Sequence, residues 1–403
     1  MTVFLHFCSM IQELLIALPM FVCGIFFLQL LLSLYRKWDA ARGWLAVWAF
    51  AATVLYGCHF VFFHHSMTLM PVSDTVYVVC NLLVYPLFLI YIYVLTEAKW
   101  PHWMMGVLGM AVAAGVVVGV LYAQMTPTEV EQFVREYLYQ GKAGALMGVV
   151  ATQSVVHFVC RILFAAEVVW VVVAGTYKIR RYNELVRSVY ADTDDKTLGH
   201  ISVLLWLLIF TSSISLVANT LGRCWFAESV WLLTIPALCF SVLLFGIGWT
   251  GLWQQFSMSD VLKDEQEALS TQSLNSGKGK VEPFGEADDD DMEPRLNGGG
   301  RKMVEELAER LERIVEDQQI YLRPGLKLDE LANQMGTNRT YLQQALREVL
   351  HTTFSEYINR LRIAYAEKLM ADHPDIKKED LATRSGYVSL SSFYRNFHQF
   401  RQK

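Results

Sequence analysis

Long runs of apolar residues dominate the first 250 positions of the chain. A helix needs about 20 consecutive apolar residues to cross the hydrocarbon core of a bilayer, where no water can satisfy the backbone. Seven runs meet this length, and we expect each to form a membrane-spanning helix: 11–35, 43–63, 75–95, 103–123, 149–176, 201–221 and 230–252. The first run has no Lys or Arg before it and is longer than a signal-peptide core, so we expect it to remain in the mature chain.

Basic residues alternate between the loops that join these runs. The first, third and fifth loops hold nine Lys and Arg residues in total, whereas the second, fourth and sixth hold three. Positively charged loops stay in the cytoplasm. The sequence therefore predicts a multi-pass protein of the inner membrane, with its N-terminus outside and its C-terminal region in the cytoplasm.

The fifth run contains ionisable residues, which are costly inside a bilayer. Arg161 lies near its middle, one helical turn from His157, and Glu167 lies well short of its cytoplasmic end. Such residues mark a ligand contact or an ion path by default. His157, Arg161 and Glu167 are thus candidates for intramembrane sensing, and the alternative is that partners on other helices neutralise them and only fix the packing.

Composition divides the chain where the apolar runs end. The whole sequence is 54% hydrophobic and 18% charged, yet residues 1–252 carry 13 basic and 13 acidic side chains while 301–403 carry 17 and 15. Between them, 253–300 has 4 basic and 11 acidic side chains, including the run Asp288–Asp291. This composition predicts a flexible linker with a short helix over 260–269. The acidic run either shields a basic DNA-binding face or only solvates a spacer.

The last hundred residues contain a near-repeat at a separation of 50 positions. Both copies, 328–350 and 378–400, have Leu-Ala followed by Gly four residues after the Ala, which places Ala332, Gly336, Ala382 and Gly386 in equivalent positions. A small Ala lets two helices approach, and a Gly adopts the positive φ of a tight turn, so each copy predicts a helix-turn-helix. Leu342 and Phe393 are the expected apolar anchors of the second helices.

Two further helices are predicted around the copies. A helix over 353–371 joins them, and its expected apolar stripe consists of Phe354, Ile358, Leu361, Ala364, Tyr365 and Leu369. A helix over 303–317 precedes them and has apolar residues at helical spacing. The sequence thus predicts an all-α protein with a seven-helix transmembrane domain (1–252), a linker (253–300) and a cytoplasmic double helix-turn-helix domain (301–403).

The segments YLRPGLKLDELA, FSEYINRLRIAYAEKLM and GYVSLSSFYRNF lie in this region. Through them about a quarter of the chain resembles the DNA-binding domain of AraC/XylS-type transcription regulators. The resemblance implies sequence-specific control of transcription, with two helix-turn-helix units entering successive major grooves on one face of the duplex. It departs at the end, because the family usually continues with a Gly-x-x-Pro segment and this sequence stops at Lys403, so we expect a closing helix to be absent.

Recognition helices present polar side chains near their N-terminal ends to the base edges of DNA. With Asn338 and Ser389 as the expected N-caps, the predicted outward-facing DNA-binding residues are Arg339, Thr340, Gln343, Gln344, Ser391, Ser392, Tyr394 and Arg395. Arg360, Arg362, Lys377 and Lys378 are predicted to contact phosphates. A helical module that binds another protein could carry a similar charge, but the repeat favours DNA.

We therefore predict a membrane-bound one-component transcription regulator. Its expected partners are double-stranded DNA, the lipid bilayer, an unidentified signal and a second copy in a homodimer. We expect no enzyme activity, cofactor or metal, because the sequence has no phosphate-binding GxxxxGK[ST], HExxH or nucleophile-elbow motif. One alternative is a channel or carrier whose attached domain reports its state. Another is a passive anchor from which proteolysis releases the regulator.

Overall fold

The computed structural model describes residues 2–64, 66–142, 147–221, 230–254, 256–264, 266 and 298–401. These residues are mostly helical and form no strand, which confirms the predicted all-α fold. They divide into two compact units, one of Met1–Arg180 and Leu198–Met258, the other of Arg181–Thr197 and Ser259–Lys403. The second unit therefore includes a segment that lies between the fifth and sixth apolar runs in the sequence.

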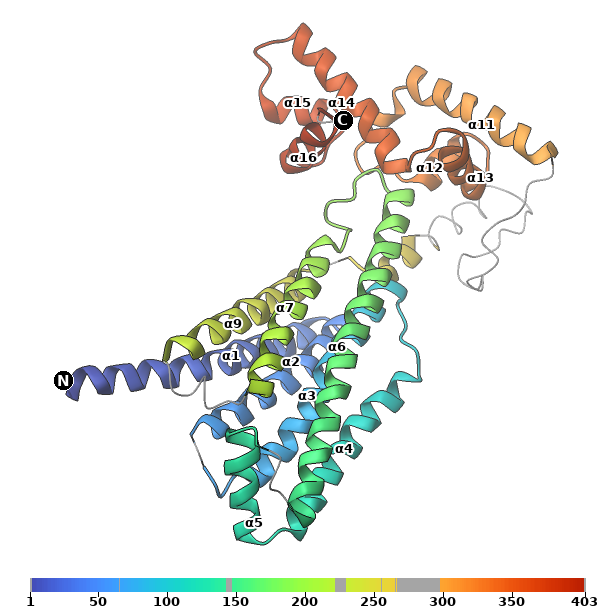
Figure 1. Cartoon of the computed structure of the whole chain (residues 1–403). Coiled ribbons are helices and arrows are strands. Elements are labelled where there is room, and N and C mark those ends of the chain that lie inside the picture. Colours follow the sequence, from blue (N-terminus) through green and yellow to red (C-terminus); the bar gives the residue numbers. More distant parts are fainter. Residues whose placement is uncertain are drawn as a thin grey trace. The chain divides into compact units, whose positions relative to one another are not determined.

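Seven helices coincide with the seven apolar runs (Figure 1). They are α1 (Thr2–Arg36), α2 (Ala40–Phe63), α3 (Met70–Glu97), α4 (Met104–Gln124), α6 (Gly148–Val189), α7 (Gly199–Leu221) and α9 (Val230–Trp253). Among the described residues, six helical stretches are long and apolar enough to cross a membrane. The described apolar part of α7, Gly199–Leu208, is shorter, so the seventh span stays a prediction.

The first unit carries apolar side chains on its outside and polar side chains within. Phe21, Phe158 and Val169 are each more than half exposed, whereas Asp74 and His157 are buried. A water-soluble domain shows the opposite distribution and rarely exposes so much apolar surface. The outer surface of this unit therefore suits a lipid environment.

Helix α9 packs closely on α1 and α2 through glycines. A Cβ at Gly248 would overlap the ring of Phe26, and a Cβ at Gly251 would overlap the side chain of Leu45. Small residues at such crossings let helices approach where no hydrophobic effect drives them together. The glycines thus fix the packing of the last candidate span on the first two.

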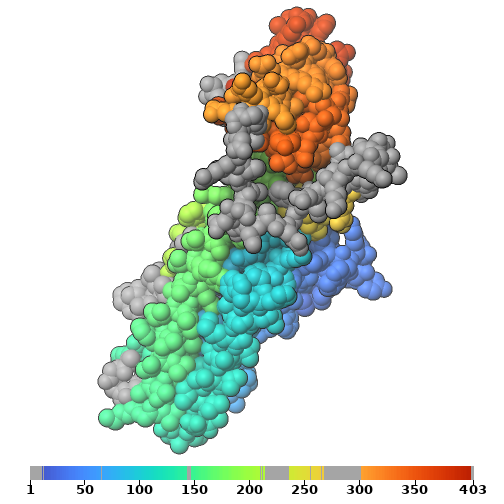
Figure 2. Space-filling view, turned by 90° about the vertical axis from the view of Figure 1, so that its right-hand side faces the viewer, coloured from blue at the N-terminus to red at the C-terminus, as the bar shows by residue number. Residues whose placement is uncertain are grey.

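The second unit contains the predicted helix-turn-helix pairs (Figure 1). Its elements are α11 (Gly298–Asp317), η2 (Ile320–Leu322), α12 (Leu328–Gln334), α13 (Arg339–Gln344), η3 (Ala345–Val349), α14 (Phe354–Asp372), α15 (Lys378–Arg384) and α16 (Leu390–Arg401). Helix α14 joins the first pair to the second. In the space-filling view the side chains form one surface from the orange of α11 to the red of the C-terminal helices (Figure 2).

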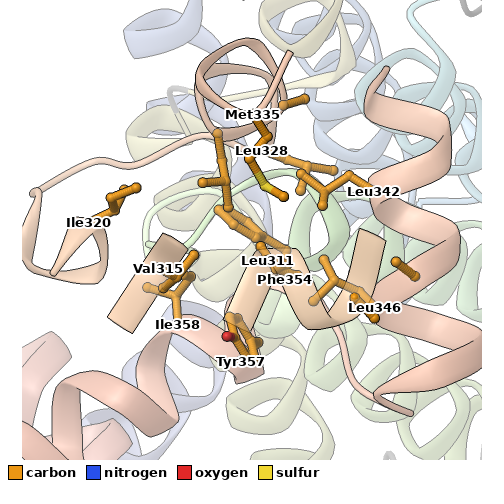
Figure 3. Packing of buried hydrophobic residues seen from close by; sticks show 14 of the residues in the cluster. Leu311, Val315, Ile320, Leu328, Met335, Leu342, Leu346, Phe354, Tyr357 and Ile358 are labelled. Carbon is orange, nitrogen blue, oxygen red and sulfur yellow. The ribbon is translucent and has the colours of Figure 1, made fainter. Parts of the chain in front are cut away.

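Two apolar cores lie in this unit. In the first, α11 contributes Leu311 and Val315, which pack against residues of α12, α13 and the start of α14 (Figure 3). The second is smaller and gathers Ile363, Leu381, Tyr387 and Phe393. Each helix-turn-helix pair thus has an apolar core of its own.

Helix α14 serves both cores, so the single predicted apolar stripe is incomplete. Phe354 and Ile358 are buried as expected, but so are Tyr357, Ile363 and Ala366, which lie off that stripe. Ala364, predicted on the stripe, is exposed. A helix between two cores must bury different faces at its two ends, and one continuous periodicity does not represent this.

Only part of the predicted linker falls within the described residues. Residues 258–264 are helical, in agreement with part of the helix expected over 260–269. The side chain of Lys327 forms an ion pair with Asp264 at 3.0 Å within the second unit. The acidic run Asp288–Asp291 lies outside the described residues.

Candidate DNA-binding interface

The first helix-turn-helix is formed by α12 and α13. Gly336 occupies the turn with φ of +62°, and Ala332 is buried where the two helices meet. The Oδ1 of Asn338 accepts a hydrogen bond from the backbone N–H of Thr340 at 2.8 Å and so caps α13. Leu342 is fully buried and anchors α13 in the core.

The predicted contact residues of α13 differ in their availability. Thr340 is exposed, whereas the Nε2 of Gln343 donates to Ser188 Oγ at 2.9 Å and that of Gln344 donates to Glu348 at 2.9 Å. Arg339 lies 3.6 Å from Asp329 with most of its side chain covered. Thr340 is thus accessible, while the other three side chains have partners within the module.

The second helix-turn-helix is formed by α15 and α16. Gly386 has φ of +81°, and a Cβ there would lie 2.8 Å from the backbone oxygen of Leu322. The Oγ of Ser389 accepts from the backbone N–H of Ser392 at 3.2 Å, as an N-cap does. Glycine is therefore required at this turn for two reasons: the positive φ and the close approach of the Leu322 backbone.

The expected outward face of α16 needs one correction. Ser391 and Arg395 are exposed and Tyr394 is half-buried, but Ser392 is buried and does not face outward. Ser392 directly precedes Phe393, the buried anchor of α16, and its own side chain is buried as well. Arg395 donates from Nη1 to Asp194 Oδ1 at 2.7 Å.

The expected phosphate contacts also need one correction. Arg360, Lys377 and Lys378 are exposed, as a phosphate contact requires. Arg362 is fully buried, and its guanidinium binds the backbone oxygens of Tyr321 and Arg323 at 2.6 and 2.7 Å. The prediction for Arg362 is wrong, because this side chain fixes the interior of the module.

Arg362 also pairs with Asp192 at 2.7 Å and lies over the ring of Tyr387 at 5.2 Å. Burial raises the pKa of the Tyr387 phenol well above its ordinary value, and the nearby Arg362 charge opposes that shift. The phenol therefore stays neutral at physiological pH. The cationic guanidinium links the two cores through a neutral aromatic ring.

A second polar cluster lies within the first unit. The Nε2 of His157 lies 2.8 Å from Asp74 Oδ2, which also accepts a hydrogen bond from Tyr122 at 2.8 Å. The guanidinium of Arg161 lies 5.0 Å from the ring centre of Tyr137. The structure thus groups His157 and Arg161 around a carboxylate, Asp74, that the sequence analysis missed.

The cluster borders a cavity of about 40 Å³, lined among others by Asn81 and Cys160. Such a volume holds a few waters and is far below the several hundred Å³ of an organic-ligand pocket. Glu167 is buried elsewhere on α6, and within the described residues its carboxylate has no hydrogen-bond partner. Asp74 lies one residue before the predicted third span, and a window extended by one turn would have found it.

Among the described residues, no group of three or more His, Cys, Asp or Glu side chains is placed to hold a metal ion. The two helix pairs, α12 with α13 and α15 with α16, together with the connecting helix α14 define a double helix-turn-helix. This class of fold binds DNA. A family model described as a helix-turn-helix domain matches residues 331–402.

Known relatives match the same region. Regulatory protein SoxS of Salmonella typhimurium is 37% identical over 76 residues, which are 18% of this chain and 68% of the relative. Regulatory protein SoxS of Escherichia coli K12 is 36% identical over the same shares. The probable transcription factor PqrA of Proteus vulgaris is 29% identical over 79 residues, 20% of this chain and 64% of the relative. No solved structure matches the chain.

Through this domain the chain belongs to the AraC family of DNA-binding transcription regulators.

Proposed function

We propose that this AraC-family regulator is bound to the inner membrane. It couples a signal at or in the membrane to the binding of a specific DNA sequence. One observation carries the proposal: the same chain holds a unit whose outer helices expose apolar side chains and a separate double helix-turn-helix unit. In this proposal the chain crosses the membrane seven times, with the N-terminus outside and the DNA-binding domain in the cytoplasm, as the basic residues of alternate loops indicate. Two copies in a homodimer present two such domains to one operator and raise their effective concentration.

Each helix-turn-helix reads one box of the operator. In the first helix-turn-helix Thr340, Gln343 and Gln344 contact bases, and Arg339 joins them once it leaves Asp329. In the second helix-turn-helix Ser391, Tyr394 and Arg395 do so, while Arg360, Lys377 and Lys378 bind phosphates. Glutamine suits adenine because its amide donates to N7 and accepts from the N6 amino group, and arginine suits guanine because it donates to both O6 and N7.

Selection from a randomised duplex pool by the full chain in lipid nanodiscs tests this role. We expect a motif of two boxes about one helical turn apart. Gln344→Ala should relax the sequence at one box and Arg395→Ala at the other. Bulk binding that depends only on salt, with no enriched motif, would refute specific recognition. Reporter fusions after residues 64, 140 and 403 test the topology, and the predicted orientation requires the first two outside and the last inside.

The signal acts at the polar cluster around His157 and Arg161. A buried carboxylate beside a histidine inside an apolar unit is costly, and residues of this kind mark functional positions. The small cavity favours a proton, a small ion or a change in helix packing over a bulky metabolite. Glu167 forms a second sensitive point on α6.

A transcriptional reporter driven by the selected operator tests this sensing role. Asp74→Asn keeps the shape of the side chain and removes its charge, and His157→Gln keeps a hydrogen-bonding side chain and removes the basicity of the imidazole. We expect both to hold the reporter at one level under conditions that change it in the wild type, with unchanged amounts of protein in the membrane. A normal response in both variants would show that the cluster serves only packing.

A further inference from the structure

The segment Arg181–Thr197 is built into the second unit. Ala191 is fully buried within the first apolar core, and its N–H donates to the Leu326 oxygen at 3.1 Å. Its carbonyl accepts from Ser355 at 3.0 Å and from Asn359 at 2.9 Å. Buried backbone groups satisfied in this way belong to a specific docked conformation.

Asp192 anchors the same segment by its charge. One carboxylate oxygen receives Arg362 Nη1 at 2.7 Å, and the other receives the Gly325 N–H at 2.8 Å. Both contacts are charge-assisted, and Arg362 is completely enclosed. The Arg362 guanidinium and the Gly325 N–H therefore form a binding site for one carboxylate, which Asp192 occupies.

Two other residues of the segment reach the predicted recognition side chains. Ser188 accepts a hydrogen bond from the Nε2 of Gln343 in the first helix-turn-helix, and Asp194 accepts one from the guanidinium of Arg395 in the second helix-turn-helix. These are the donor groups that base edges would need. One short segment thus engages both helix-turn-helix units at once.

We propose that Arg181–Thr197 is an intramolecular competitor of DNA, which docks through Asp192 on Arg362 and engages one recognition residue of each helix-turn-helix, Gln343 and Arg395. The inference rests on the proposed DNA-binding function and names its regulation. A guanine that takes two N–H groups of Arg395 competes with Asp194 for the guanidinium, and a base that takes the amide of Gln343 competes with Ser188 for its hydrogens. Phosphates would also repel the carboxylates of Asp192, Asp194 and Asp195.

The place of the segment in the sequence shows how a signal could reach it. It joins the fifth and sixth apolar runs, so it is covalently continuous with helices of the first unit on both sides. A change in those helices reaches the segment directly and does not pass through residues 267–297. The stimulus therefore alters DNA affinity by engaging or releasing this segment.

Asp194→Ala in the full chain in nanodiscs tests the competition, with Asp195→Ala as the matched control. Asp195 carries the same charge on the same segment, is exposed, and forms no ion pair with any described residue. Affinity for the selected operator should rise about threefold in Asp194→Ala, the usual worth of a partly exposed ion pair, and change by less than about 1.5-fold in Asp195→Ala.

A double-mutant cycle separates the specific contact from a general charge effect. In an Arg395→Ala background, Asp194→Ala should no longer raise affinity. An equal gain in both backgrounds, or equal gains from Asp194→Ala and Asp195→Ala, would overturn the competition while leaving DNA binding intact. Failure of every variant and of the wild type to enrich a sequence would instead overturn the proposed function, and the competitor with it.

Cross-linking tests the docking without relying on affinity changes. A short bismaleimide should join the thiols of a Ser188→Cys, Gln343→Cys chain, and the cross-linked protein should lose operator binding relative to the same variant left untreated. The single variant Ser188→Cys, treated alike, controls for the seven native cysteines. Absence of the cross-link, or full operator binding by the cross-linked protein, would refute the competitor.

Discussion

The two helix-turn-helix units share one sequence pattern but have different supports. Among the described residues, the first has a core of nineteen buried apolar residues, to which α11, η2, the docked segment and the start of α14 contribute in addition to α12, α13 and η3. The second has six, from α14, α15, α16 and the turn before α16. Equal motifs therefore do not give equal stability, because a motif specifies the turn and its neighbours determine how much apolar area is buried.

The turns of the two units differ in the same direction. Gly336 has open space where a Cβ would lie, whereas Gly386 packs against the backbone of Leu322. The second helix-turn-helix, which has the smaller core, thus depends on close contact with residues that precede the first helix-turn-helix. Arg362 strengthens this dependence, since it binds the Tyr321 and Arg323 oxygens and lies over Tyr387.

Removing the partner of Arg362 should have the largest effect. Asp192→Ala leaves the buried Arg362 cation with only its carbonyl acceptors. We expect the free energy of unfolding of the DNA-binding unit to fall by about 3–5 kcal/mol. Hydrogen exchange of the full chain should show faster exchange in α15 and α16 as well as near Gly325. Unchanged exchange in the second pair would mean that the two units do not share this support. Asp195→Ala is the control.

The paired glycine substitutions should follow. Gly336→Ala meets only the strain of positive φ, about 1 kcal/mol, because its surroundings are open. Gly386→Ala adds a backbone overlap that cannot relax by a rotamer change, and we expect about 2–4 kcal/mol, of the order found for strained or overpacked sites. Exchange rates of the amides of α13 and α16 measure the two losses. Equal losses would contradict the tighter packing of the second turn.

Removing a recognition side chain should cost less than this, as a loss of affinity for one box of the operator. Gln343→Ala and Arg395→Ala should each cost about 1–3 kcal/mol for the selected operator, the usual worth of a base contact. Competition assays with duplexes altered in one box at a time provide the measurement. Each variant should become insensitive to changes in its own box only. Loss of discrimination at both boxes in either variant would argue against one box per unit.

The N-caps should give the smallest difference. Asn338→Ala removes a 2.8 Å hydrogen bond and Ser389→Ala a 3.2 Å one. We expect losses of about 1 and about 0.5 kcal/mol, within the usual range for caps. Exchange of the first-turn amides of α13 and α16 reports both, and Thr337→Ala is a control next to the first cap. A larger loss at Ser389 would reverse the expected order.

The sequence predicted the elements of the second unit because its signals are local. The Ala-to-Gly spacing and the apolar anchors lie within one copy of the repeat, and a copy contains what its turn needs. The apolar runs predicted the helices of the first unit for the same reason. In each case the determining residues lie within about 20 positions of one another.

The errors and omissions concern contacts between distant residues. Arg362 and Asp192 are 170 positions apart, so an exposed-looking arginine on an amphipathic helix gave no sign of its burial. The bond from Asp74 to His157 spans 83 positions. The segment Arg181–Thr197 contributed only to the count of loop charges, since a short irregular stretch carries no periodicity that would reveal a docking site.

The burial of Ala191 has a consequence for modularity. A DNA-binding domain that is contiguous in its gene can be moved between proteins by one recombination event, which is a common route to new regulators. Here the first core is completed by a residue encoded more than one hundred positions upstream of α11, within the membrane portion of the gene. A graft of residues 298–403 onto another sensor would leave that core uncovered. The apolar helices of the first compact unit and the DNA-binding domain are thus expected to be inherited together, and changes in one should be accompanied by changes in the other.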